Sequence, residues 1–173
     1  MPSRASSRHA SKVLASAERR LLSFRPGGAT ALFDALAFSG NFLAKYPEHA
    51  ARRVLLLFSD GNDTYSRTGA NESLGTVVAA GSLLYTIDPN PSGNNWRGTA
   101  VLRQLADATG GRLLSTADDT ANPIDTILSD LRASYIVTYQ LPNRTVGFHS
   151  LRILPRHNLN LRFHCQEGYS YDE

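Results

Sequence analysis

The sequence has little cysteine and no long apolar run. Cys165 is the one cysteine among 173 residues, so an intrachain disulfide is excluded. No stretch approaches the roughly 18 apolar residues of a membrane-spanning helix. The first twenty residues also lack the apolar centre of a secretory signal. We therefore expect no membrane span and, for the sequence as it stands, a cytoplasmic location, although the compartment itself stays open.

The sequence also has little excess of one sign of charge. The chain carries 18 Lys and Arg against 15 Asp and Glu, which gives a net charge of +3. Because the arginines are spread along the chain, no basic stripe for nucleic acid is indicated. Hydrophobic residues make up 42% and charged residues 19% of the sequence, as in ordinary globular domains.

The sequence lacks the common catalytic and cofactor motifs. His149, His157, His164 and Cys165 have spacings that match no usual zinc site. Gly27-Gly28 lacks the lysine of a phosphate-binding loop and the spacing of a dinucleotide-binding loop. No Gly-x-Ser-x-Gly nucleophile motif occurs. We therefore expect no enzyme, no catalytic residue and no small-molecule cofactor, with an α/β enzyme of unknown reaction as the remote alternative.

What the sequence does contain is an alternation of helical and strand patterns. The spacing of apolar residues predicts three regions: a disordered segment 1–11, an α/β domain 12–134 and an antiparallel β extension 135–173. Helix–strand alternation of this kind predicts a parallel sheet with right-handed crossovers. The predicted helices are 12–24, 31–46, 71–80, 99–109 and 122–132; the predicted strands are 53–58, 83–87 and 112–115, followed by 135–141, 148–154 and 159–164 in the extension.

Short polar residues mark the starts of these helices. Thr30, Asn71 and Thr99 are the predicted N-caps, and Asn122-Pro123 opens the last helix with proline at its favoured first position. Helix 31–46 is apolar nearly all round, so we expect it to be largely covered. Strand 53–58 is apolar on both faces, which is typical of an interior parallel strand.

Oxygen-bearing side chains follow strand 53–58. Ser59 and Asp60 come directly after it, and Thr30 precedes a helix that follows two glycines. Ligands of open α/β sheets bind at the carboxyl ends of the strands, and oxygen atoms suit hard cations. Asp60 is thus either a site residue or a turn residue, and Thr30 a site hydroxyl, an N-cap or both. Asp63 is read as loop solvation or outer support of the site; Asp34 is read as a carboxylate at the positive end of a helix dipole.

Five segments in order resemble the von Willebrand factor type A (VWA) domain, and more narrowly the bacterial VWA-related proteins. The resemblance covers about 27 to 171. The segments are GGATALFDAL, RRVLLLFSDGNDT, LLYTIDPN, LRQLADATGGRLL and ILSDLRASYIVTYQLPN.

The resemblance implies a doubly wound, mostly parallel sheet with a metal-ion-dependent adhesion site at its top. In the family that site joins an Asp-x-Ser-x-Ser loop, a threonine that matches Thr30 and an aspartate that matches Asp60. This sequence has no Asp-x-Ser-x-Ser segment. We therefore expect a domain that lacks its first strands, an incomplete site of Thr30 and Asp60 with possible support from Ser59 and Asp63, and weak or absent Mg²⁺ binding.

The resemblance also implies the function. We expect a protein-interaction module, with a truncated structural or assembly piece without metal-dependent binding as the alternative. The expected partner is another protein, bound through an acidic side chain or by completing the sheet edge that the missing strands leave at 53–58. Full-length relatives of this kind are often exported.

Overall fold

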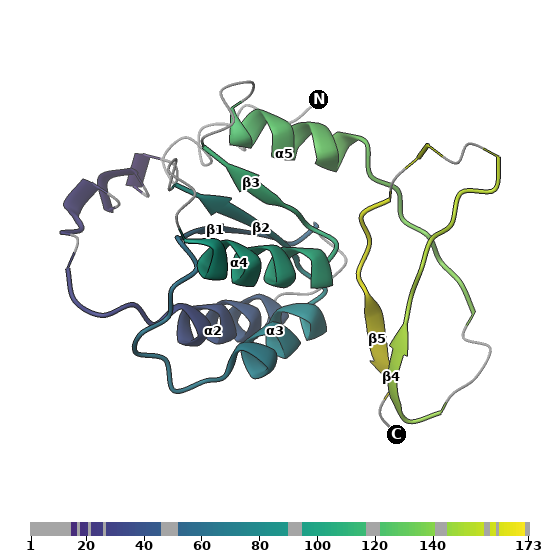
Figure 1. Cartoon of the computed structure of the whole chain (residues 1–173), viewed down its shortest axis with the longest axis horizontal. Helices are drawn as coiled ribbons and strands as arrows, with labels where there is room; N and C mark the ends of the chain where they lie inside the picture. The colour runs from purple at the N-terminus through teal and green to yellow at the C-terminus, as the bar shows by residue number, and fades with distance from the viewer. Residues whose placement is uncertain are drawn as a thin grey trace.

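The computed structural model describes most of the chain. The described residues are 15–16, 18–20, 22–25, 27–45, 52–89, 95–116, 122–140, 145–157, 160–161 and 163–171. The segment 1–11, predicted to be disordered, lies outside them. Residues 15–16, 18–20 and 22–23 are helical and exposed, within the helix predicted at 12–24. Figure 1 shows this first segment, in purple, standing apart from the rest.

The remaining elements alternate as the sequence pattern predicts. They are α2 (Leu32–Ala44), β1 (Val54–Phe58), α3 (Ala70–Ala79), β2 (Leu83–Asp88), α4 (Trp96–Ala108), β3 (Leu113–Ser115), α5 (Pro123–Arg132), β4 (Gly147–Ser150) and β5 (Gly168–Tyr171).

Among the described residues, β1, β2 and β3 form a parallel sheet in the order β1-β2-β3. Leu56 lies opposite Tyr85, and Ile87 lies opposite Leu114. Helices α2, α3 and α4 lie on one side of this sheet and α5 on the other (Figure 1). The predicted α/β class with a parallel sheet is thus confirmed.

The core is split by the central strand β2. Leu84 of β2 packs with Leu36, Val77 and Leu105 from the three helices on one face. Tyr85 and Ile87 pack with residues of α5 on the other face, among them Ile127. Each such side chain, taken out of water, contributes about 1.5–3 kcal/mol, so β2 is the strand on which both helical layers depend.

Strand β1 lies at the edge of the sheet, so its prediction as an interior strand is wrong. No strand in the described part of the chain pairs with its second side. Leu56 is 44% exposed and Phe58 is 61% exposed. The outcome agrees with the apolar edge that the family resemblance implies.

Two helices are less covered than predicted. Phe38 of α2 is 72% exposed and its ring stacks on that of Phe42 at 6.3 Å. The reason is that α2 is covered on one face only, where Gly40 lies so close to Thr76 of α3 that a Cβ would not fit. In α5, whose apolar residues recur at helical spacing, Ile127 is buried, whereas Ile124 and Leu128 are each about two-fifths exposed.

The C-terminal extension contains an antiparallel pair, as predicted, but not the three predicted strands. β4 pairs with β5, with Phe148 opposite Ser170. Residues 135–140, 151–154 and 163–164, which are described, lie in no strand. An apolar run forms a strand only where a neighbouring strand takes up its backbone hydrogen bonds. Tyr135 is 91% exposed, so this run is not packed against the rest of the fold.

Within the same described ranges, no helix combines the length and the apolar character needed to cross a membrane.

Candidate functional site

The candidate site lies at the carboxyl ends of β1 and β2. Ser59 and Asp60 follow β1, and Asp88 is the last residue of β2. The Ser59 amide donates to the carbonyl oxygen of Ile87 at 3.2 Å, so the parallel ladder extends one residue beyond β1. This places the loop that begins with Asp60 next to the end of β2.

The loop after β1 is folded by its own side chains. The hydroxyl oxygen of Ser59 accepts from the amide of Gly61 at 3.0 Å. One carboxylate oxygen of Asp60 accepts from the backbone amide of Asn62 at 3.1 Å, and the other accepts from its side-chain amide at 2.9 Å. Ser59 and Asp60 therefore bond within the turn, which is one of the two roles that the sequence left open for Asp60.

The first turn of α4 closes over this loop. The side-chain amide of Asn95 donates to the carbonyl oxygen of Asp60 at 2.9 Å, and its oxygen accepts from the amide of Gly98 at 3.1 Å. Gly61, with φ +79°, lies against Gly98 of α4. A Cβ on Gly61 would clash with the backbone of Gly98, and a Cβ on Gly98 would clash with the carbonyl oxygen of Asp60. Asn95 is the N-cap of α4, so the prediction of Thr99 as that cap is wrong.

Thr99 instead reaches a residue that the sequence analysis missed. Its hydroxyl donates to a carboxylate oxygen of Asp88 at 3.1 Å. Asp88 is only 6% exposed. The sequence indicated the position of Asp88, because it ends an apolar strand much as Asp60 comes shortly after one. The carboxyl ends of parallel strands lie at one edge of a sheet.

The segment with Thr30 is bonded to the loop that Asp60 begins. The Thr30 amide donates to the hydroxyl oxygen of Thr64 at 2.9 Å. The carbonyl oxygen of Thr30 accepts from the amides of Thr64 and Tyr65, both at 2.9 Å. The segment before α2 and the loop after β1 therefore lie together, joined through backbone groups of Thr30.

Thr30 is not the N-cap of α2, and that prediction is wrong. The N-cap is Ala31, which has no side chain able to accept a hydrogen bond. Asp63 supplies the acceptor from the neighbouring loop: one carboxylate oxygen accepts from the amides of Leu32 at 2.7 Å and Phe33 at 3.3 Å. Asn71 is likewise inside α3, whose N-cap is Gly69.

Asp63 is thus a helix cap rather than a solvated loop residue. Burial pulls the pKa of Asp63 upward, but hydrogen bonds from Ser66 and from the amides of Phe33 and Leu32 outweigh it and hold the pKa below its usual value. The carboxylate form is therefore favoured at the N-terminus of α2, where the helix dipole also favours negative charge.

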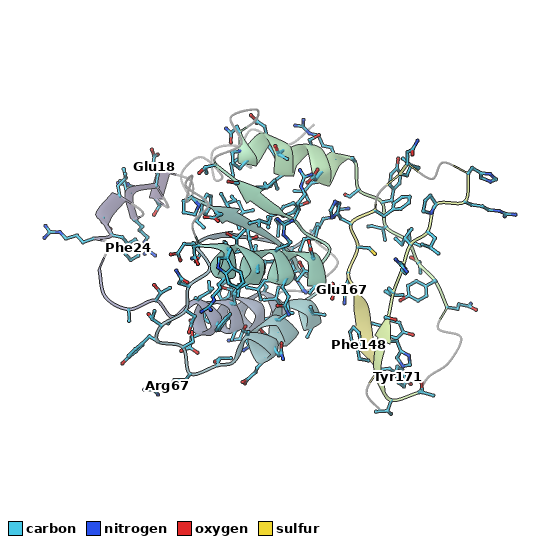
Figure 2. All side chains as sticks on the ribbon, viewed as in Figure 1. Glu18, Phe24, Arg67, Phe148, Glu167 and Tyr171 are labelled. Carbon is cyan, nitrogen blue, oxygen red and sulfur yellow. The ribbon has the colours of Figure 1, made fainter. Side chains whose placement is uncertain are left out.

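Asp34 joins the same helix to the segment before α3. Its carboxylate accepts from the amides of Thr68 at 2.8 Å and Arg67 at 3.1 Å. The bonds from the amide and side chain of Thr68, followed by the amide of Arg67, lower the pKa of Asp34. Asp34 lies in the first turn of α2, where a carboxylate favours the positive end of the helix dipole. Its hydrogen bonds, however, go to the segment before α3. Figure 2 shows Arg67 at the outer end of the loop.

The carboxylates at the candidate site are engaged in hydrogen bonds of their own. The described residues include no group of three or more histidine, cysteine, aspartate or glutamate side chains able to hold a metal. Mg²⁺ takes about six oxygen ligands in near-octahedral geometry. Of the predicted set, Asp63 caps α2, and both oxygens of Asp60 already accept hydrogen bonds from Asn62.

Comparison of the chain with protein-family models, with curated proteins and with solved structures finds no match.

Proposed function

We propose that the chain is a protein-interaction module of the VWA type whose binding surface is the rim of loops at the carboxyl ends of β1 and β2. In this proposal the parallel sheet is a doubly wound sheet that lacks its first strands. The five ordered segments that resemble the family support this assignment, and the sheet order and helical layers agree with it.

The bonding of the Thr30 segment to the Asp60 loop carries the proposal. Thr30 and Asp60 come from segments about thirty residues apart, on either side of α2 and β1, yet the first is held by Thr64 and Tyr65 of the same loop that begins with Asp60. Asn95 and Thr99 of α4 fix the other side of that loop and of β2. A rim braced from three segments is a rigid surface suited to binding a partner protein.

A metal titration tests the site. Mn²⁺ or Mg²⁺ is titrated into the chain by calorimetry, with the Asp60→Ala variant and Asp107→Ala, an exposed carboxylate on α4, as the matched control. A partial ligand set is expected to give millimolar affinity that Asp60→Ala abolishes and Asp107→Ala keeps. Equal heats in all three proteins would contradict a site at Asp60.

The second candidate is a structural or assembly piece without metal-dependent binding. It is favoured by the use of Ser59, Asp60 and Asp63 for bonds within and between their own loops. Absence of any heat at millimolar metal would support it. Turnover lost on substitution of Thr30 or Asp60 would instead revive the enzyme alternative.

A further inference from the structure

The outer side of β1 offers a row of backbone groups. The carbonyl oxygen of Arg53 accepts from Leu83, and the amide of Ser59 donates to Ile87, so the odd-numbered residues of this segment face β2. In a parallel ladder the alternate residues point their N–H and C=O groups the other way. Val54, Leu56 and Phe58 therefore present their backbone groups at the edge with which no described strand pairs.

The side chains at this edge are apolar and share one face. Leu55 and Leu57 pack into the cluster under α2, α3 and α4, whereas Val54 packs on the α5 side. Since side chains alternate along a strand, Leu56 and Phe58 lie on the α5 side with Val54. Long, exposed, apolar edge strands are templates for pairing with another strand.

The charges that flank β1 select the partner. Arg52 precedes the ladder and Asp60 follows it, at equal separations from Leu56 along the sequence; the Arg52 guanidinium also donates to the carbonyl oxygen of Leu131 at 3.2 Å. A two-fold axis through Leu56 would set Val54 opposite Phe58 of a second copy, Leu56 opposite Leu56 and Arg52 opposite Asp60. Every outward N–H and C=O of the three edge residues then finds a partner in hydrogen-bonded pairs. A parallel arrangement would instead place like charges together.

We infer that β1 is a homodimerisation edge, at which two copies of this chain pair antiparallel about Leu56 to form one continuous sheet. Such an interface is self-complementary, as two-fold symmetry demands. It sets Leu56 against Leu56 and Phe58 against Val54 of the other copy. Unlike charges face each other at both ends, and each such pair adds to the cross-strand stabilisation. This inference rests on β1 and the two charged residues that flank it, and it holds whether or not the rim binds metal.

Sedimentation of the full chain over a range of concentrations tests the inference. The wild-type protein is expected to form a reversible dimer. Leu56→Lys is expected to give a monomer, because two lysines would meet at the axis while the bonds from β1 to β2 stay intact. Phe38→Lys, at a still more exposed apolar residue of α2, is the control and is expected to stay dimeric.

A charge exchange tests the register independently. Arg52→Asp alone is expected to raise the dimer Kd about tenfold, since two attractive pairs become repulsive. Adding Asp60→Arg to the same chain is expected to restore the dimer, even though that substitution removes the carboxylate proposed for the rim. Circular dichroism of each variant verifies folding.

Several outcomes would overturn the inference. These are a monomeric wild type, open-ended association, dissociation by Phe38→Lys in place of Leu56→Lys, and failure of the charge exchange to restore the dimer. A monomer in which the amides of Val54, Leu56 and Phe58 resist hydrogen exchange would show that a different segment covers the edge, and would overturn it as well.

Discussion

At the scale of single residues, carboxylates act mainly as connectors between loops and helix ends. Asp63 accepts from two amides of the first turn of α2 and also binds Ser66. Asp34 in that turn binds the amides of Arg67 and Thr68. The two residues thus hold the start of α2 and the β1–α3 loop together from opposite sides.

Replacing Asp63 should therefore destabilise the fold and alter its response to acid. Asp63→Ala leaves two amides of α2 without their acceptor and should cost about 1–2 kcal/mol of unfolding free energy at pH 7. Asp63→Asn keeps an acceptor oxygen and should cost less. Urea unfolding followed by circular dichroism measures both, with Asp107→Ala as the control, which should change little.

The sign of the acid effect follows from the lowered pKa values. The pKa of Asp63 is lower in the folded protein than the roughly 3.9 of an unfolded aspartate. Its stabilisation is therefore fully present above that unfolded value and is lost as the pH falls through the folded value. Wild-type stability should drop below about pH 4 more steeply than that of Asp63→Asn. Parallel pH profiles would contradict the capping role.

At the scale of elements, close approach of backbones fixes the candidate site. Gly98, in the first turn of α4, contacts the carbonyl of Asp60 with no room for a Cβ. Gly98→Ala should push α4 away from the β1–α3 loop and cost about 1–3 kcal/mol. Gly75→Ala is the matched helix substitution, because nothing lies within 4 Å of its added Cβ in α3, and it should stabilise by about 0.5–1 kcal/mol. Equal effects in thermal unfolding would contradict the close contact.

The strands of the sheet were predictable and the helix caps were not. Runs of apolar residues, such as Val54–Phe58 and Leu83–Asp88, identify strands because the pattern is local. Asn122 could also be predicted as a cap, since it accepts from Ile124 two residues on. The cap of α2 could not, because Asp63 lies 31 residues beyond Leu32 and only the fold brings them together.

The candidate site was predicted in part for the same reason. Asp60 follows an apolar strand, which locates it at the rim from sequence alone. Asp88, the last residue of β2, lies at the same rim and was missed; its position could be read from the sequence, but its bond to Thr99 of the next helix could not. From the sequence, only the family resemblance indicated that Thr30 lies near the loop that begins with Asp60. The bonds of Thr30 to Thr64 and Tyr65 join residues far apart in the chain, so no local pattern could predict them.

At the scale of the whole molecule, the C-terminal extension is joined to the sheet body by few contacts. The amide of Glu167 donates to the carbonyl oxygen of Ala108 at 3.3 Å, and Gln166 forms an isolated bridge with Thr109. Figure 2 shows Glu167 between the body and the hairpin that bears Phe148 and Tyr171. With Tyr135 and Ile136 almost fully exposed, the extension should open more readily than the core around β2.

Gly110 is the residue on which this attachment depends. It has φ +81°, and a Cβ there would meet the backbone of Cys165 and Gln166 at 2.8 Å. Gly110→Ala should therefore weaken the attachment and make proteolysis of residues 134–165 about tenfold faster, because cleavage follows the population of the open form when opening is fast. Gly81→Ala provides the control, since Gly81 has φ +61° at the end of α3 and carries the same backbone cost. Similar acceleration in both variants would show that the strained backbone, and not the loss of this contact, sets the rate. Acceleration in Gly110→Ala alone, with the body intact on the gel, would show that the extension is held at the α4–β3 turn and unfolds as a separate unit.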